Sequence, residues 1–94
     1  DPECPVTTDQ PEVLATAYVR SDRTLVAVAN FAEEHRDIHL DVNWRQLGIA
    51  LQNARVRAPD IEEVQEQTEF RPGDAIPVSA KRGWLLILEA GKQN

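Results

Sequence analysis

The chain has 94 residues, enough for one domain, and its 41% hydrophobic and 28% charged residues are typical of a globular protein rather than a disordered one. Ten basic residues are scattered among sixteen acidic ones, which leaves a net charge of −6 and argues against nucleic-acid binding. The longest apolar stretches have five residues, whereas a membrane span needs about 20. The single cysteine, Cys4, excludes an internal disulfide.

The N-terminal segment, residues 1–12, contains Pro2, Pro5 and Pro11. Proline fixes its own φ angle and pushes the preceding residue to extended geometry. This segment is therefore predicted to be an extended linker or a strand that leads into the domain. Because the chain starts at Asp1 and contains no methionine, we expect it to be a processed or excised piece of a longer protein.

The first strand pattern runs from residue 13 to residue 31. Residues 13–19 alternate with a period of two, residues 21–23 form a short polar turn, and residues 24–31 form a second apolar run, so a β-hairpin is predicted. The run from Leu25 to Val28 leaves neither face of the second strand polar, which is typical of a central strand covered on both sides. In so small a domain one side should be the core. The other side is a candidate contact surface for something outside this chain.

The middle of the chain predicts a strand followed by a turn. Residues 37–42 alternate between polar and apolar side chains, which favours a strand with one wet face. Asn43 can cap a short helical turn over residues 43–48, which Gly48 closes. We expect this turn to lay Trp44 and Leu47 over one end of the core.

The second half of the chain predicts further strands. Residues 54–58 form one that Pro59 ends, and the acidic segment around Ile61 and Val64 is interpreted as an edge strand. Residues 75–78 are predicted to form another edge strand, because they contain Pro77. Residues 84–89 are predicted to form a central strand, and residues 90–94 a flexible tail. About seven short strands and one helical turn (43–48) predict an all-β fold, an antiparallel β-sandwich covering residues 13–89.

The acidic and histidine residues do not predict a reaction centre. Glu62 and Glu63 are adjacent and would point to opposite faces of a strand, whereas glycoside hydrolysis needs two carboxyl groups that flank a cleft. A strand face carrying Asp37, His39 and Asp41 spaces them at about 6.6 Å per step, too wide for ligands that each approach one ion to about 2 Å. No catalytic residue and no metal site are predicted.

Nucleophilic and phosphate chemistry are equally unsupported. Cys4 has no histidine near it in the sequence, and both serines lie in predicted turns without a nucleophile-elbow pattern. The four glycines are isolated and form no phosphate-binding loop. We predict no cofactor.

Sugar binding depends on exposed aromatic platforms. Phe31 and Trp84 lie on apolar strands and are expected in the core, which leaves Tyr18 and Trp44 as candidate platforms. Polar groups alongside them would come from Arg55 or Arg57. For Trp44 the competing interpretation is a lid on the core.

Four stretches, taken in order, carry a resemblance to a known family. They are VLATAYVRSDRTLVAVANF, IHLDVNWRQLGI, APDIEEVQ and IPVSAKRGWLLILE. The sequence resembles the C-terminal β-sandwich domain of bacterial glycoside-hydrolase-like multidomain proteins, in which an all-β domain follows a barrel catalytic domain. The resemblance covers residues 13–89, and its most specific parts are residues 43–48, Asn-Trp-Arg-Gln-Leu-Gly, and residues 82–84, Arg-Gly-Trp.

The resemblance implies a non-catalytic accessory domain that packs on the catalytic domain of its parent chain and stabilises it. The catalytic acids of such proteins belong to the barrel, so none is carried over to this chain, and the parent would be the glycoside hydrolase. The resemblance also implies a secreted or periplasmic bacterial protein. Two alternatives stay open: a carbohydrate-binding module that holds an oligosaccharide, and an immunoglobulin-like interaction domain that uses an edge strand or a loop end.

Overall fold

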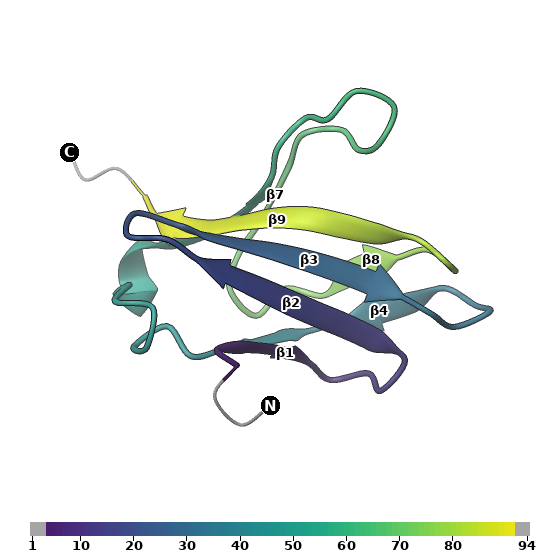
Figure 1. Ribbon diagram of the computed structural model, residues 1–94, viewed down its shortest axis with the longest axis horizontal. Coiled ribbons are helices and arrows are strands. Elements are labelled where there is room, and N and C mark those ends of the chain that lie inside the picture. Colours follow the sequence, from purple (N-terminus) through teal and green to yellow (C-terminus); the bar gives the residue numbers. More distant parts are fainter. Residues whose placement is uncertain (1–3, 92–94) are drawn as a thin grey trace.

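A computed structural model describes residues 4–91 and has an all-β fold (Figure 1). Within this range there are nine strands, all paired antiparallel, and one short 3-10 helix. No helix in this part of the chain is long and apolar enough to cross a membrane. The elements are β1 Val6–Thr8, β2 Val13–Val19, β3 Thr24–Asn30, β4 Arg36–Ile38, β5 Leu40–Val42, η1 Leu51–Asn53, β6 Ala54–Ala58, β7 Thr68–Phe70, β8 Ile76–Val78 and β9 Gly83–Ala90.

The strands form a large sheet and a second layer beneath it (Figure 1). The large sheet has the strand order β2-β3-β9-β6-β7. The second layer consists of the pairs β1-β5 and β4-β8. Residues 36–42 serve both pairs, because the first half of this segment pairs with β8 and the second half with β1. The predicted strand over residues 37–42 is therefore two short strands separated at His39.

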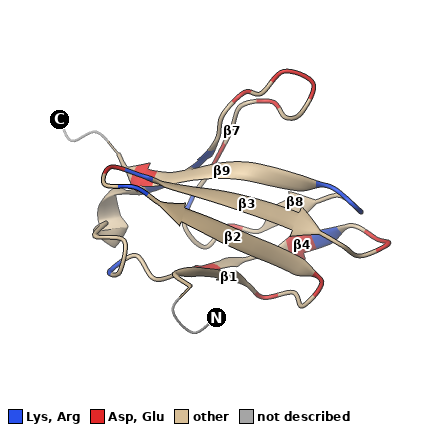
Figure 2. Cartoon of the chain, in the orientation of Figure 1, with Lys and Arg blue, Asp and Glu red and all other residues tan. Residues whose placement is uncertain are grey.

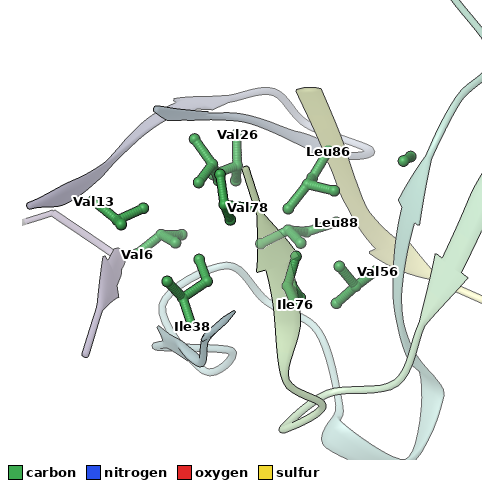
Figure 3. Close-up of a cluster of buried hydrophobic side chains, with 11 residues drawn as sticks. Val6, Val13, Val26, Ile38, Val56, Ile76, Val78, Leu86 and Leu88 are labelled. Atoms are coloured by element: carbon green, nitrogen blue, oxygen red, sulfur yellow. The ribbon is translucent and has the colours of Figure 1, made fainter. Parts of the chain in front are cut away.

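The core lies between the two layers, where side chains from both of them meet (Figure 3). The large sheet contributes mainly valine and leucine from β3, β6 and β9, and the second layer contributes valine and isoleucine from β1, β4 and β8. This arrangement confirms the predicted antiparallel β-sandwich. The buried cluster is Val6, Val13, Val26, Val28, Ile38, Val56, Ala58, Ile76, Val78, Leu86 and Leu88.

The predicted hairpin is confirmed as β2-β3, with Val13 opposite Asn30 and Val19 opposite Thr24. β3 and β9 are central strands, as their apolar character on both faces predicts. The prediction that Phe31 belongs to the core is wrong, because its side chain is 60% exposed. β3 ends one residue earlier, at Asn30, and Phe31 leaves the sheet.

Asn30 ends β3 by joining the two layers. Its side chain is only 2% exposed, and its amide donates to the carbonyl oxygens of Val78 at 3.0 Å and Glu34 at 3.1 Å. Its carbonyl oxygen accepts the backbone N–H of Ala32 at 2.8 Å. A buried amide is tolerated only when it is hydrogen-bonded in this way.

Gly83 and Trp84 begin β9, and the surrounding structure restricts which residue each position can hold. A Cβ atom on Gly83 would lie 1.9 Å from the carbonyl oxygen of Val28, so β3 and β9 approach too closely there for any side chain. Trp84 packs against the core, stacks edge-on against Phe70 with ring centroids 5.5 Å apart, and donates its indole N–H to Pro77 at 2.7 Å. Trp84 was expected in the core; in the structure it is half-buried and lies at the edge of the core cluster.

The acidic segment after Pro59 is not the edge strand that the sequence predicts. Ile61 and Gln65 form only an isolated bridge, and the strand at this edge of the large sheet is β7. The physical reason is the Gln65 side chain, which donates to the carbonyl oxygen of Leu85 at 2.8 Å and accepts the N–H of Leu85 at 3.0 Å. An amide side chain thus satisfies the backbone of β9 where another strand would have paired.

The predicted turn over residues 43–48 is present as a series of hydrogen-bonded turns, not as a helical segment. The one helical segment within residues 4–91 is η1, which begins eight residues after Asn43. The Asn43 side chain caps the turn by accepting the N–H of Gln46 at 3.0 Å, and Gly48 closes it with φ of 73°. Within the predicted linker, 1–12, residues 6–8 form β1. Residues 1–3 of that linker lie outside the described residues. So do residues 92–94 of the predicted tail, 90–94.

Candidate functional site

The side of the large sheet that faces away from the core is apolar. We call it the outer face, and it comprises Leu14, Thr16, Tyr18, Leu25, Ala27, Ala29, Leu85 and Ile87. These residues come from β2, β3 and β9, and they alternate with the inward-facing residues because successive strand side chains point to opposite sides. None of the eight carries a charge, and the middle of these strands is free of charged residues in Figure 2.

Four of the eight outer-face residues are exposed and the other four are half-buried. Leu14 is 57% exposed, Tyr18 49% and Leu25 38%. Single exposed apolar residues are common on protein surfaces, but a contiguous patch over three strands marks an interaction surface. The expectation that the second side of residues 24–31 is a surface rather than a second core agrees with this exposure.

Charged residues border the outer face on the side of β6. Arg55 and Arg57 lie on β6, and they form ion pairs with Glu69 of β7 and Glu89 of β9 respectively. The hydrogen bond that Arg55 donates to the Glu69 carboxylate, together with the negative charge of that carboxylate, raises the pKa of Arg55 above its usual value. Both guanidinium groups are already paired with a carboxylate. Their main role is therefore to form a polar border beside the apolar strands.

The structure brings Tyr18 and Arg57 into one cross-strand row but keeps them apart. The row runs from Tyr18 through Leu25 and Ile87 to Arg57. Three strand spacings separate the ends of this row, which is about 14 Å. Tyr18 instead lines a shallow hollow of about 370 Å³ with Leu25, Ile87, Arg20 and Arg23.

Trp44 lies elsewhere in the molecule. It packs against the buried cluster and lines, with Val56 and Ile76, a small gap of about 20 Å³ at the interior side of the sheets. Val56 points inward whereas Arg55 and Arg57 point outward, so Trp44 is on the opposite side of the large sheet from Tyr18. The four residues proposed from the sequence as a sugar site are therefore not brought together.

The histidines contact carboxylates singly. The ring of His39 lies 2.8 Å from Asp9, whose other oxygen accepts the N–H of His39 at 2.9 Å, and the ring of His35 lies 2.6 Å from Asp37. The hydrogen bonds from the His39 backbone and ring hold the pKa of Asp9 below its usual value of 3.8. Over residues 4–91 there is no group of three or more side chains suited to hold a metal ion.

Sequence reasoning identified the two-faced apolar character of β3 and β9 but missed the contribution of β2. The signal was available, since Leu14 and Tyr18 occupy the positions of β2 that alternate with the small inward residues Ala15 and Ala17. The alternation of residues 13–19 predicted only a strand, and no contact surface was assigned to its Leu14 side. In the structure they are more exposed than Leu25, the other exposed large hydrophobic residue of the outer face.

Comparison with known proteins places the chain in a family. The family described as glycoside hydrolase 123, C-terminal domain, matches residues 1–89. Neither the curated proteins nor the solved structures gave a match. The chain, with its two-layered β fold, belongs to the C-terminal domain family of glycoside hydrolase 123.

Proposed function

We propose that this domain is a non-catalytic accessory domain that packs through its outer face on the catalytic domain of a glycoside hydrolase and stabilises it. The observation that carries the proposal is the charge-free apolar surface over β2, β3 and β9. Left exposed, such a surface is a liability for a soluble protein. In a family defined as the C-terminal domain of a hydrolase, the remainder of that hydrolase is the natural partner.

The surroundings of the carboxylates support a non-catalytic role. A glycosidase acid needs an apolar pocket that raises its pKa so that it keeps its proton at neutral pH. Asp9 has the opposite perturbation, because its pKa is lowered by His39. Glu33 and Glu34 are exposed in a bend, and Glu62 and Glu63 are exposed in a turn. The catalytic acids of the parent would then reside in its other domain.

The proposal also includes the secreted or periplasmic bacterial origin that the resemblance implies.

A second candidate function is carbohydrate binding, and Tyr18 is the residue that favours it. Tyr18 is about half exposed beside the hollow that Arg20 and Arg23 line. An aromatic ring next to hydrogen-bond donors is the usual form of a sugar platform. Trp44 carries the same hypothesis less well because it packs against the core.

One experiment separates these functions. The isotope-labelled 94-residue chain is titrated with the separately expressed catalytic domain of its parent and, in parallel, with a panel of oligosaccharides, while amide NMR shifts are followed. The proposal expects saturable shifts on β2, β3 and β9 with the catalytic domain and none with sugars. Sugar-induced shifts around Tyr18 would favour a binding module. No response to the catalytic domain would overturn the accessory role.

A pair of variants makes that experiment specific to the outer face. Ala27→Glu places a charge in the middle of the outer face, and Thr7→Glu places one at an exposed position of β1 in the second layer. We expect Ala27→Glu to weaken binding of the catalytic domain at least tenfold and Thr7→Glu to leave it unchanged. Equal effects from both variants would show that the outer face is not the contact.

A further inference from the structure

The strand β2 forms one edge of the large sheet, on the side away from β7 (Figure 1). An edge strand invites pairing with another strand, and proteins protect such edges by keeping them short or by adding charged residues and proline. β7 is protected in this way, since it has three residues and contains Glu69. β2 has seven residues, with neither a charge nor a proline. Of the two edges of the large sheet, β2 is therefore the unprotected one.

The hydrogen bonds between β2 and β3 show which backbone groups point outward along this edge. The N–H of Arg20 donates to the carbonyl oxygen of Arg23 at 2.8 Å, and this pair continues the β2-β3 register. In an antiparallel ladder the bonded positions alternate along each strand. The even-numbered residues of β2 therefore bond to β3, and the odd-numbered residues direct their N–H and C=O groups away from it. In the middle of the strand these residues are Ala15 and Ala17.

Within the described part of the chain, partners are present only at the two ends of this edge. At one end both backbone groups of Val13 are bonded within residues 8–13. At the other end the carbonyl oxygen of Val19 accepts a guanidinium N–H at 3.3 Å. The N–H and C=O groups of Ala15 and Ala17 have no partner among the described residues. The edge thus offers four free backbone groups, which an extended strand can satisfy.

Space for such a strand lies beside these two alanines. A hollow of about 460 Å³ is lined by residues 13–17 and by β1 with its neighbours. Ala15, which packs toward the core, and Leu14 and Thr16, which belong to the outer face, all line it. The hollow therefore runs along the edge of β2 rather than over one of its faces. An extended backbone placed there meets the free groups of Ala15 and Ala17.

We propose that two copies of this domain pair antiparallel through β2, about a two-fold axis at Thr16, and join their large sheets into one. Ala15 then lies opposite the partner's Ala17, and Ala17 lies opposite the partner's Ala15. Each of these pairs exchanges two hydrogen bonds, so the free groups of both alanines are satisfied in both copies. This self-association goes beyond the proposed accessory function and does not depend on it.

A second copy fits this edge because the free groups are arranged symmetrically about Thr16. A two-fold axis repeats every contact, so the edge must be complementary to itself. On the outer side of the joined sheet, Thr16 faces the partner's Thr16 and Leu14 faces the partner's Tyr18, and cross-strand pairs of these kinds stabilise sheets. β2 carries no charge, so no like charges meet within the pair of strands. Because one strand from each copy is a small contact, we expect the dimer to dissociate on dilution.

Sedimentation equilibrium of the 94-residue chain, from micromolar to millimolar concentration, tests the pairing. Ala17→Pro removes one N–H from the edge and keeps the bonds between β2 and β3, because Ala17 faces away from β3. The two-fold axis repeats the change, so two of the four hydrogen bonds are lost, and we expect the dissociation constant of the dimer to rise at least about tenfold. Ala27→Glu, in the middle of the outer face, is the control and should change it less than about threefold. Amide NMR spectra establish whether each variant is folded.

Disulfide crosslinking tests the register. In a Cys4→Ser background, Thr16→Cys places two cysteines opposite each other at a non-hydrogen-bonded pair, where Cα atoms are about 4.5 Å apart, within the range of a disulfide. Leu14→Cys is the control, because the same residue of the partner lies four positions along the strand, about 14 Å away. With oxidised glutathione as the oxidant, we expect Thr16→Cys to give linked dimers at least about tenfold faster than Leu14→Cys.

Three results would overturn the pairing through β2: a chain that stays monomeric at millimolar concentration, a dimer that survives Ala17→Pro, or equal crosslinking of the two cysteine variants. Loss of the dimer in Ala27→Glu but not in Ala17→Pro would show that the outer faces meet instead. If Ala17→Pro does not fold, or if both variants lose the dimer, the crosslinking result decides. None of these measurements uses the catalytic domain, so their failure leaves the proposed accessory function as it stands.

Discussion

The two faces of the large sheet are built from the same strands and differ in what covers them. On β3, Val26 and Val28 point inward and are essentially inaccessible, whereas Leu25 on the other face is 38% exposed. Apolar residues alternate with apolar residues, so periodicity alone does not distinguish the faces. An apolar strand face therefore indicates that something covers it. It does not indicate whether the covering element belongs to the same chain.

The difference arises because the second layer can cover only one face. β1, β4, β5 and β8 have three residues each, and together they cover the inner side of a five-stranded sheet. The described part of the chain has no element over the outer face (Figure 1). Three tests of this comparison follow, and then one of a residue on neither face, from the largest expected effect to the smallest.

Truncating neighbouring leucines on opposite faces should give the largest contrast. Leu86 is completely buried and Leu85 points outward on the same strand. We expect Leu86→Ala to lower the free energy of unfolding by about 4 kcal/mol, because it leaves a cavity, and Leu85→Ala to lower it by less than about 1 kcal/mol. Urea unfolding of the isolated chain measures both, and similar losses would mean that the outer face is part of the folding core.

On the outward side of the large sheet, Gly83 should be the position where a substitution lowers the free energy of unfolding strongly. Gly83→Ala forces a Cβ atom against the carbonyl oxygen of Val28, so we expect a loss of about 3 kcal/mol, as in an overpacked core. Gly48→Ala is the control, since Gly48 has a positive φ but no atom within 4 Å of a Cβ, and strain alone should cost about 1 kcal/mol. Thermal unfolding compares them. A cost at Gly83 no larger than at Gly48 would show that β3 and β9 can separate freely.

Asn30 tests the polar residue within the inner face. Asn30→Ala removes the amide that bonds Val78 and Ala32, and we expect a loss of about 2 kcal/mol because buried partners are left without bonds. Asn43→Ala removes an exposed cap on a turn and should cost about 1 kcal/mol or less. Urea midpoints rank the two variants, and a larger loss at Asn43 would contradict the role of Asn30 in joining the layers.

The smallest effect concerns acid sensitivity and lies on neither face. The pKa of Asp9 is lower in the folded state than its usual value of 3.8, so the ionised carboxylate stabilises the fold. That contribution is complete above the unfolded pKa and disappears as the pH falls through the lower folded pKa. Asp9→Asn should therefore lose less stability than the parent sequence on acidification below about pH 4. Parallel pH profiles for the two proteins would contradict this assignment.

Trp44 shows where sequence reasoning about the site reached its limit. Its position within the capped turn over residues 43–48 predicted that it lies over one end of the core, and that part agrees with its packing against the buried cluster. Its possible use as a sugar platform beside Arg55 and Arg57 depended on which side of the large sheet each residue occupies. Those sides follow from pairing between β6, β7 and β9, which neighbouring residues do not encode.

The sequence by itself determined the local features of this protein. Period-two alternation and turn residues predicted the β2-β3 hairpin, the two-faced apolar runs predicted that β3 and β9 are central, and Asn43 predicted its own cap. These are properties of residues within a few positions of one another, where backbone geometry and side-chain direction are coupled.

Only the tertiary structure decided the contacts between distant segments. It divided residues 36–42 between two partners, placed the Gln65 amide against Leu85 and turned Phe31 outward. Within residues 4–91 it also left one apolar face of the large sheet uncovered. The physical reason is that burial is non-directional: it requires each apolar face to be covered, and only the complete packing of the chain determines which faces the chain covers itself.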